Sequence, residues 1–331
     1  MIKILSIIGT RPQYIKIKPL FDHFNKSDQY QHLIIDTLQH YSDNVSKHII
    51  KDLGLSIDYS LEIDKSSELD FIANSIQKIG ELILKENPDY VFVFGDTNST
   101  FCAALSSYKM KKKICHIEAG LRCGNKTVPE EINRIFTDSV SDINFCSSID
   151  AMTNVRNGIY CGDLEYELLN KLNPKIDFLD YGVMTIHRQT NCSINKLDKI
   201  MQYCRKTNKK IIFPAHHRIK KFLNKLEIPR NVEIIDPVTY TEMVRLMSGC
   251  EFIFTDSGSI QKTSAFFGKK TLIFREKTEW IETEEQNYCK KAENPTDDIS
   301  WIFTRVNKRN KFLYIDSDSM PSEIITRELI K

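Results

Sequence analysis

Short apolar runs alternate with longer amphipathic stretches along most of the chain. In the first half, runs of strand length end at glycine or polar residues, and the stretches between them repeat apolar residues at helical spacing. Strands are predicted near 2–8, 32–37, 90–94, 113–117 and 142–146, and helices near 14–25, 42–53, 67–86, 98–110 and 129–140. This alternation is typical of a parallel, doubly wound α/β sheet.

The same rhythm restarts after a polar, glycine-containing stretch at 157–163. Strands are predicted near 181–186, 210–214, 232–235, 251–254 and 271–274, with helices near 193–207 and 239–248 and a closing helix over 321–330. A chain of 331 residues exceeds the size at which single cores stop growing. We therefore predict two Rossmann-like domains, 1–168 and 169–308, and a C-terminal segment, 309–331, that packs back on them.

Composition narrows the class of protein. A hydrophobic fraction of 41%, a charged fraction of 27% and a net charge of +2 give no reason to expect a nucleic-acid or membrane partner. Nine cysteines without a C-x-x-C pair indicate reduced thiols, a cytoplasmic protein and no zinc site. The apolar run at 2–8 is too short for a signal peptide, and no stretch reaches membrane-spanning length. A G-x-G-x-x-G loop is absent, so no nicotinamide cofactor is expected.

Carboxylates stand where predicted strands end. Asp96 and Glu118 each follow an apolar strand, and Pro129 opens a helix whose first turn holds Glu130 and Glu131. Since open α/β sheets bind ligands at the carboxyl ends of their strands, these side chains should converge. A single acid at a helix start is as readily a cap, but three in successive loops favour acid/base chemistry by at least two of Asp96, Glu118 and Glu130. Glu131 is interpreted as a cap or salt-bridge partner.

Candidate phosphate-binding groups lie in both halves. Arg11 follows the first strand beside a helix N-terminus, where backbone N–H groups and a guanidinium suit phosphate, although a structural arginine explains it equally well. In the second half, the pair His187-Arg188 ends a strand, and the small-residue turn 257–259 opens a helix. Chemistry on a nucleotide-linked sugar without a redox cofactor therefore fits the residues best.

In their order along the chain, the motifs resemble those of the non-hydrolysing UDP-N-acetylglucosamine 2-epimerases. The resemblance is carried by Gly9–Lys16, Gln39–Tyr41, Gly95–Thr100, His116–Arg122, Pro129–Arg134, Thr185–Arg188, Asp256–Gly258 with Ile260-Gln261, and Thr278-Glu279. It implies the glycosyltransferase-B architecture, in which two Rossmann-like domains face a central cleft. It also implies a homodimer that acts on a UDP-sugar with no cofactor or metal.

The activity that the resemblance implies is interconversion of UDP-N-acetylglucosamine and UDP-N-acetylmannosamine. The reaction would proceed by anti elimination of UDP to a glycal and re-addition to the opposite face. The implied site residues are Asp96, Glu118, Glu130 and His187 for catalysis; Arg11, Lys16, Arg188, Ser257, Gly258, Ser259, Thr263 and Glu279 for substrate binding; and Gln39, His40 and His216 for a possible regulatory site.

The chain departs from the family pattern around the expected nucleotide pocket. Relatives usually show Ser-Gly-Gly-Ile-Gln-Glu-Glu where this sequence reads Ser-Gly-Ser-Ile-Gln-Lys-Thr, so Thr263 replaces a carboxylate expected at the ribose diol. Three alternatives follow. One is a 2-epimerase of a rare UDP-sugar, either a 6-deoxy-L-hexosamine such as UDP-L-quinovosamine or UDP-L-rhamnosamine, or a diacetamido-uronate. The others are a hydrolysing epimerase, disfavoured by the loop 9–13, and a nucleotide-sugar-binding homologue without turnover.

Overall fold

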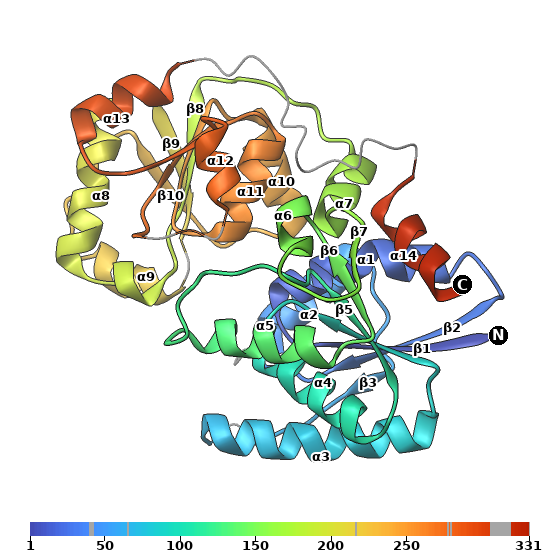
Figure 1. The fold of residues 1–331 in the computed structure, drawn as a ribbon. Coiled ribbons are helices and arrows are strands. Elements are labelled where there is room, and N and C mark those ends of the chain that lie inside the picture. Colours follow the sequence, from blue (N-terminus) through green and yellow to red (C-terminus); the bar gives the residue numbers. More distant parts are fainter. Residues whose placement is uncertain are drawn as a thin grey trace. The chain divides into compact units, whose positions relative to one another are not determined.

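The chain forms two compact α/β units (Figure 1). The computed structural model describes residues 1–39, 43–64, 66–215, 217–276, 278, 280–304 and 319–330. The first unit contains Met1–Leu172 and the C-terminal helix α14 (Pro321–Ile330), and the second begins at Asn173. Each unit is built on one parallel sheet, so the predicted α/β class is confirmed.

The sheet of the first unit has seven strands in the order β3-β2-β1-β4-β5-β6-β7. The order reverses between β1 and β4, which pair in parallel, and ligands of doubly wound folds bind at such a switch point. The loops that leave β1 and β4 are therefore the first place to look for a site. The strands are β1 (Ile2–Ile8), β2 (Tyr30–Asp36), β3 (Tyr59–Ser60), β4 (Tyr90–Phe94), β5 (Lys113–Ile117), β6 (Ile143–Cys146) and β7 (Gly158–Tyr160).

Helices connect these strands and bury apolar side chains against the sheet, where Leu5, Ile7, Val91 and Val93 are fully buried. Helix α14 packs against α1 and α7, and the buried carboxylate of Glu167 accepts hydrogen bonds from the backbone N–H and hydroxyl of the α14 residue Ser322, at 2.8 and 2.7 Å. The helices are α1 (Arg11–Phe24), α2 (Asp43–Leu53), α3 (Glu68–Glu86), α4 (Asn98–Lys109), α5 (Pro129–Val140), α6 (Ile149–Met152) and α7 (Leu164–Leu172).

The second unit has a six-stranded parallel sheet in the order β10-β9-β8-β11-β12-β13. Here the order reverses between β8 and β11, so the loops leaving these two strands define a second switch point. The strands are β8 (Tyr181–Thr185), β9 (Lys210–Pro214), β10 (Val232–Ile235), β11 (Phe252–Thr255), β12 (Lys270–Ile273) and β13 (Cys289–Lys291). The helices are the 3₁₀-helix η1 (Gln189–Asn191), α8 (Ile194–Thr207), α9 (His217–Leu223), α10 (Tyr240–Gly249), α11 (Gly258–Phe266), α12 (Ile281–Glu285) and α13 (Pro295–Ile302).

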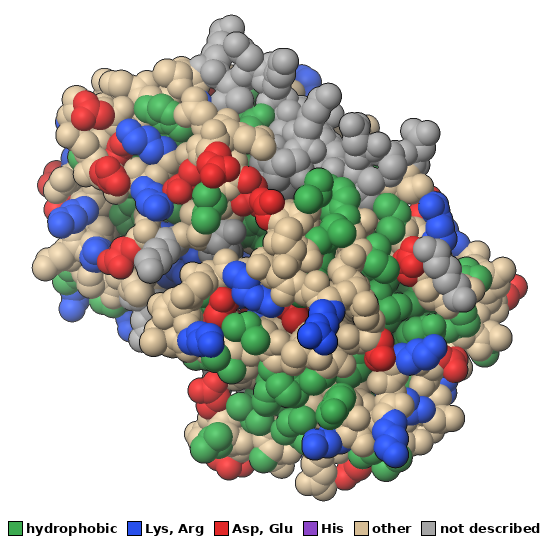
Figure 2. All heavy atoms as spheres, in the orientation of Figure 1, with side chains coloured by type: hydrophobic (Ala, Val, Ile, Leu, Met, Phe, Trp, Pro, Cys, Tyr) green, Lys and Arg blue, Asp and Glu red, His purple; other side chains and the backbone are tan. Residues whose placement is uncertain are grey.

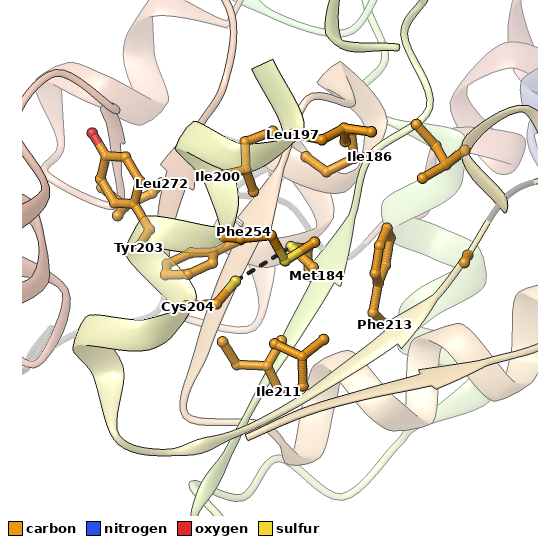
Figure 3. Close-up of a cluster of buried hydrophobic side chains, with 14 of the residues drawn as sticks. Met184, Ile186, Leu197, Ile200, Tyr203, Cys204, Ile211, Phe213, Phe254 and Leu272 are labelled. Carbon is orange, nitrogen blue, oxygen red and sulfur yellow. Dashed lines mark hydrogen bonds between the residues drawn. The ribbon is translucent and has the colours of Figure 1, made fainter. Parts of the chain in front are cut away.

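A dense core holds α8 against this second sheet (Figure 3). Met184 of β8 and Phe254 of β11 are fully buried, together with Leu197 and Cys204 of α8. The Cys204 thiol lies 3.8 Å from the Met184 sulfur.

All nine cysteines of the chain are free thiols. Among the described residues, no helix combines the length and the apolar character needed to cross a membrane.

Several predicted bounds need correction. The first helix begins at Arg11 rather than near residue 14, because Thr10 is its N-cap and Pro12 stands in its first turn. The strand predicted at 32–37 runs from Tyr30 to Asp36. The stretch 157–163, interpreted as an interruption, contains β7, and the predicted domain division at 168 falls inside α7.

The stability of the first unit should depend on the histidine of β2. The His32 ring contacts Phe24, its Nε2 lies 2.8 Å from Ser6 Oγ, and burial lowers its pKa from 6.5 to about 3. As the pH falls, His32 is protonated near pH 6.5 in the unfolded chain but only near pH 3 in the folded chain. Protonation therefore favours the unfolded chain between these two values, and the free energy of unfolding decreases as the pH falls through this range. Between pH 6 and 4, we expect the unfolding free energy from urea titrations to fall about 1.4 kcal/mol per pH unit more steeply for the wild type than for His32→Gln. Equal slopes would contradict a neutral His32.

Candidate active site

One buried amide ties together the two loops at the switch point of the first sheet. Gln13 Oε1 accepts from the backbone N–H groups of Gly9 and Thr10 at 2.8 and 3.0 Å, which is the side-chain half of a capping box at the start of α1. Its Nε2 donates to the Phe94 carbonyl at 2.7 Å and to the Thr97 hydroxyl at 3.0 Å. The loop that carries Arg11 is thereby fixed to the loop that carries Asp96.

Gly9 allows this close approach. A Cβ atom at Gly9 would lie 2.0 Å from Thr37 Oγ1 and 2.6 Å from Ser99 Oγ, so no side chain fits there. The carbonyl oxygen of the Gln39 side chain accepts from the Ser99 backbone N–H at 2.9 Å, at the start of α4. In this structure Gln39 therefore secures the switch-point loops. The other two predicted regulatory residues, His40 and His216, lie outside the described residues.

Asp96 belongs to an ion-pair network with α5. The Arg134 guanidinium contacts the carboxylates of both Asp96 and Glu131, and the Arg134 side chain is 7% exposed. Glu131, which is buried, also accepts from the backbone N–H groups of Cys123 and Gly124 at 3.0 and 3.1 Å. Burial raises the pKa of Glu131, but these hydrogen bonds and Arg134 outweigh it and hold the pKa below its ordinary value. The predicted salt-bridge role of Glu131 is confirmed.

Glu118 stands at the end of β5 with a backbone φ of +66°, a left-handed conformation that is uncommon for a residue with a side chain. Such strain concentrates at functional sites, where the surrounding structure must hold it. Lys16 of α1 forms an ion pair with the Glu118 carboxylate, and the two side chains are 12% and 13% exposed. A predicted acid and a predicted cation therefore meet in the first unit.

Glu130 differs from the other two acids. It lies in the first turn of α5 beside Pro129 and is exposed, as is Arg11 at the start of α1. Asp96 and Glu118 follow the neighbouring strands β4 and β5, as the sequence predicted, and both face cations. Proton transfer is a common role of carboxylates at such positions.

In the second unit, Asp256 organises the loop that leaves β8. This fully buried carboxylate accepts from the backbone N–H groups of His187 at 3.1 Å and Arg188 at 2.9 Å, and from Asn191 Nδ2 at 2.9 Å. His187 Nδ1 lies 3.2 Å from Asp256 Oδ1, while the imidazole remains 44% exposed. Asp256 therefore orients a histidine whose ring stays accessible.

The turn after β11 opens helix α11 beside this loop. Ser257 is the N-cap of α11, and its hydroxyl accepts from the Ile260 backbone N–H at 3.4 Å. Gly258 and Ser259 form the first turn, where helix N–H groups favour an anion. The buried Thr263 donates its hydroxyl to the Ser259 carbonyl at 2.9 Å. Glu279, the remaining predicted substrate-binding residue, lies outside the described residues.

Four residues that organise the candidate site residues of one or the other unit were not predicted to take part. They are Gln13, Arg134, Asp256 and His116, whose ring lies between the two acid-bearing loops. The sequence contains a pattern that could have identified Gln13, because Thr10-x-x-Gln13 has the spacing of a capping box. It also contains one for Arg134, because Glu131 and Arg134 are three residues apart on a helix and can form an ion pair. The described residues contain no group of three or more His, Cys, Asp or Glu placed to hold a metal ion.

Comparison with known proteins assigns the chain to a family. A family model described as UDP-N-acetylglucosamine 2-epimerase matches residues 22–321. The chain belongs to this family. A UDP-N-acetylglucosamine 2-epimerase homolog of Methanococcus maripaludis is 38% identical over 308 residues, which cover 85% of this chain and 86% of the relative. The UDP-2,3-diacetamido-2,3-dideoxy-D-glucuronate 2-epimerase of Pseudomonas aeruginosa is 34% identical over 301 residues, with 85% of each chain covered.

The fold agrees with that of a solved 2-epimerase. The Methanocaldococcus jannaschii UDP-GlcNAc 2-epimerase, solved in complex with UDP-GlcNAc and UDP, matches with a TM-score of 0.84 and 30% identity over 99% of both chains. The predicted membership of the 2-epimerase family, and with it the prediction of an isomerase, is confirmed.

In this 2-epimerase homologue, we expect Asp256→Asn to weaken the second unit. The asparagine side chain would have one acceptor oxygen in place of two, and its NH₂ group would face N–H groups that now donate to the carboxylate. At least one buried donor would lose its acceptor, at a cost of about 1–3 kcal/mol. Urea unfolding measures this difference. Asp198→Asn, at a side chain that is 47% exposed, is the matched control and should change stability by less than about 0.5 kcal/mol. An equally small effect at Asp256 would contradict its organising role.

Proposed function

We propose that this protein is a non-hydrolysing 2-epimerase that interconverts UDP-N-acetylglucosamine and UDP-N-acetylmannosamine. The observation that carries the proposal is the pair of carboxylates at neighbouring strand ends, with Asp96 held by Arg134 and Glu118 held by Lys16. Membership of the 2-epimerase family supports the reaction type. The M. jannaschii relative solved with UDP-GlcNAc supports the choice of substrate.

The chemistry requires two proton-handling groups. The C2 proton of the sugar is hardly acidic until the C1–O bond breaks and its electron pair leaves with UDP. The positive charge that builds at C1 then lets a carboxylate remove the C2 proton, which gives the glycal. A second group returns a proton to the opposite face of C2 while UDP adds back to C1. Asp96, Glu118 and Glu130 are the proposed acid/base residues, each contributing about 10²–10⁴ in rate if it transfers a proton.

Cationic and small residues would hold the nucleotide. Lys16 lies at the Glu118 carboxylate, so it can stabilise charge on the departing diphosphate next to the acid that handles the proton. We assign Arg11 and His187 to the diphosphate. Arg188, Ser257, Gly258, Ser259, Thr263 and Glu279 are assigned to the rest of the nucleotide. Thr263 lacks the charge of a carboxylate, so the ribose would be held less tightly than by a charged hydrogen bond of about 1.5–3 kcal/mol.

A diacetamido-uronate is the second candidate substrate. The P. aeruginosa diacetamido-glucuronate epimerase is 34% identical to this chain, and a M. maripaludis UDP-N-acetylglucosamine 2-epimerase is 33% identical, so identity does not separate the two substrates. A panel of UDP-N-acetylglucosamine, the UDP-diacetamido-uronate and a UDP-6-deoxy-L-hexosamine, followed by chromatography and proton NMR, discriminates among them. We expect UDP-N-acetylmannosamine from the first. Free N-acetylmannosamine with UDP would instead indicate a hydrolysing enzyme.

We also propose that the protein is a homodimer. We further propose that it works in the cytoplasm, which is a reducing compartment. Hydrophobic side chains gather on part of the face of the first unit that Figure 2 shows. Leu69 and Leu84 of α3 and Tyr108 of α4 are exposed. Nine free thiols are compatible with a reducing environment. Light scattering coupled to size exclusion tests the dimer, and a monomer at micromolar concentration would contradict it.

A further inference from the structure

Both ring nitrogens of His116 face hydrogen-bond acceptors. His116 lies on β5 and is fully buried. Its Nδ1 is 2.8 Å from Asp138 Oδ1 of α5, and its Nε2 is 2.7 Å from the Gly95 carbonyl oxygen. A neutral imidazole has one donor and one acceptor, so it can satisfy only one of these contacts while its other nitrogen lone pair faces an oxygen. An imidazolium satisfies both.

The alternative, a protonated Asp138, conflicts with the other partners of this carboxylate. Arg122 Nη1 donates to Asp138 Oδ2 at 2.6 Å, and the Gly120 backbone N–H donates to Oδ1 at 3.2 Å. A protonated Asp138 would have to turn its hydroxyl hydrogen toward one of these donors, since both of its oxygens already accept hydrogen bonds. Asp138 is therefore ionised, and the proton between it and His116 belongs to the ring.

The nearby thiol on β6 adds no charge to this group. The thiol of Cys146, on the neighbouring strand β6, is uncharged because burial raises its pKa to about 12. The described ion pairs of Asp138 are those with His116 and Arg122.

We propose that His116 is a positioning residue that carries a positive charge at neutral pH and fixes the two loops bearing Asp96 and Glu118. It holds the first loop through the carbonyl of Gly95, which has a φ of +66°. It holds the second through Asp138, which binds Gly120 two residues beyond Glu118. His116 thus acts on the acids through the backbone, without contacting a substrate.

The charge state can be measured without any assumption about activity. In the full-length protein labelled with ¹⁵N-histidine, the His116 ring signals are assigned through backbone correlations and recorded at pH 7.5. We expect both His116 nitrogens to be protonated. His32 is the internal control, because burial lowers its pKa to about 3 and one of its nitrogens must be bare. A bare nitrogen in His116 would overturn the proposal.

The positioning role rests on the proposed function and has a separate test. Asp138→Asn keeps the shape but removes the anion, so His116 should become neutral, and kcat should fall by about 10²-fold with KM little changed. Asp142→Asn is the matched control, because Asp142 accepts from the Ile114 backbone N–H at the opposite end of β5. An Asp138 variant with lower stability but wild-type kcat would refute positioning. A wild-type protein inactive on the whole panel would refute the proposed function and leave the charge state to the NMR result.

Discussion

Replacing Glu118 by glutamine should lower kcat for UDP-N-acetylglucosamine epimerisation by about 10²–10⁴-fold. The amide has the shape of the carboxylate but cannot accept the C2 proton or return one. It also loses the charge that pairs with Lys16, so the lysine would face the diphosphate without its partner. Initial rates followed by NMR, at substrate concentrations spanning KM, separate the effect on kcat from the effect on binding.

The matched control for this change is Glu81→Gln. Glu81 lies exposed on α3, where it accepts from Gln77 of the same helix at 3.1 Å. The same chemical change there should leave kcat and KM at their wild-type values. If Glu118→Gln kept kcat within about twofold of the wild type, no proton transfer in the slow step could be assigned to Glu118.

Replacing Arg134 by methionine should destabilise the protein by about 3–5 kcal/mol, because it leaves the buried Glu131 carboxylate without its cation. Two acids depend on this guanidinium, and the Glu131 side chain is 2% exposed. Loss of the contact to Asp96 should also lower activity, since that carboxylate would no longer be held at the end of β4. The free energy of unfolding in urea measures the first effect, and initial rates measure the second.

Two further variants make this test specific. Arg205→Met changes an arginine that is 36% exposed and 3.7 Å from Asp198, and it should cost no more than about 1 kcal/mol. Adding Glu131→Gln to the Arg134 variant should recover part of the lost stability, because the unpaired buried charge is then gone. A double variant as unstable as the sum of the two single variants would show that the ion pair is not the cause.

Much of the fold could be predicted because parallel strands are continuous apolar runs between polar breaks. Strands β4, β5, β9 and β10 have the bounds that the pattern predicted. The strands that were missed are short, such as β3 at Tyr59–Ser60 and β13 at Cys289–Lys291. Two or three residues carry too little periodicity to be distinguished from loop, and it is pairing with a neighbouring strand that makes them part of a sheet.

The site could be predicted only in part. Asp96 and Glu118 follow two neighbouring parallel strands, so both lie at the same edge of the first sheet. The alternation of strands and helices in the sequence was enough to predict this. The cations that pair with them come from residues far along the chain, such as Arg134, which lies 38 residues from Asp96. The doubly hydrogen-bonded ring of His116 likewise depends on how α5 packs, which hydrophobic periodicity does not encode.

The most direct test of the account is proton exchange at C2. The protein is incubated with UDP-N-acetylglucosamine in D₂O, and the C2 position is followed by NMR. The account predicts that deuterium enters C2 as UDP-N-acetylmannosamine appears, and that both changes are lost together in Glu118→Gln. Absence of deuterium and of the manno product over hours, at a protein concentration where the fold is intact, would contradict it.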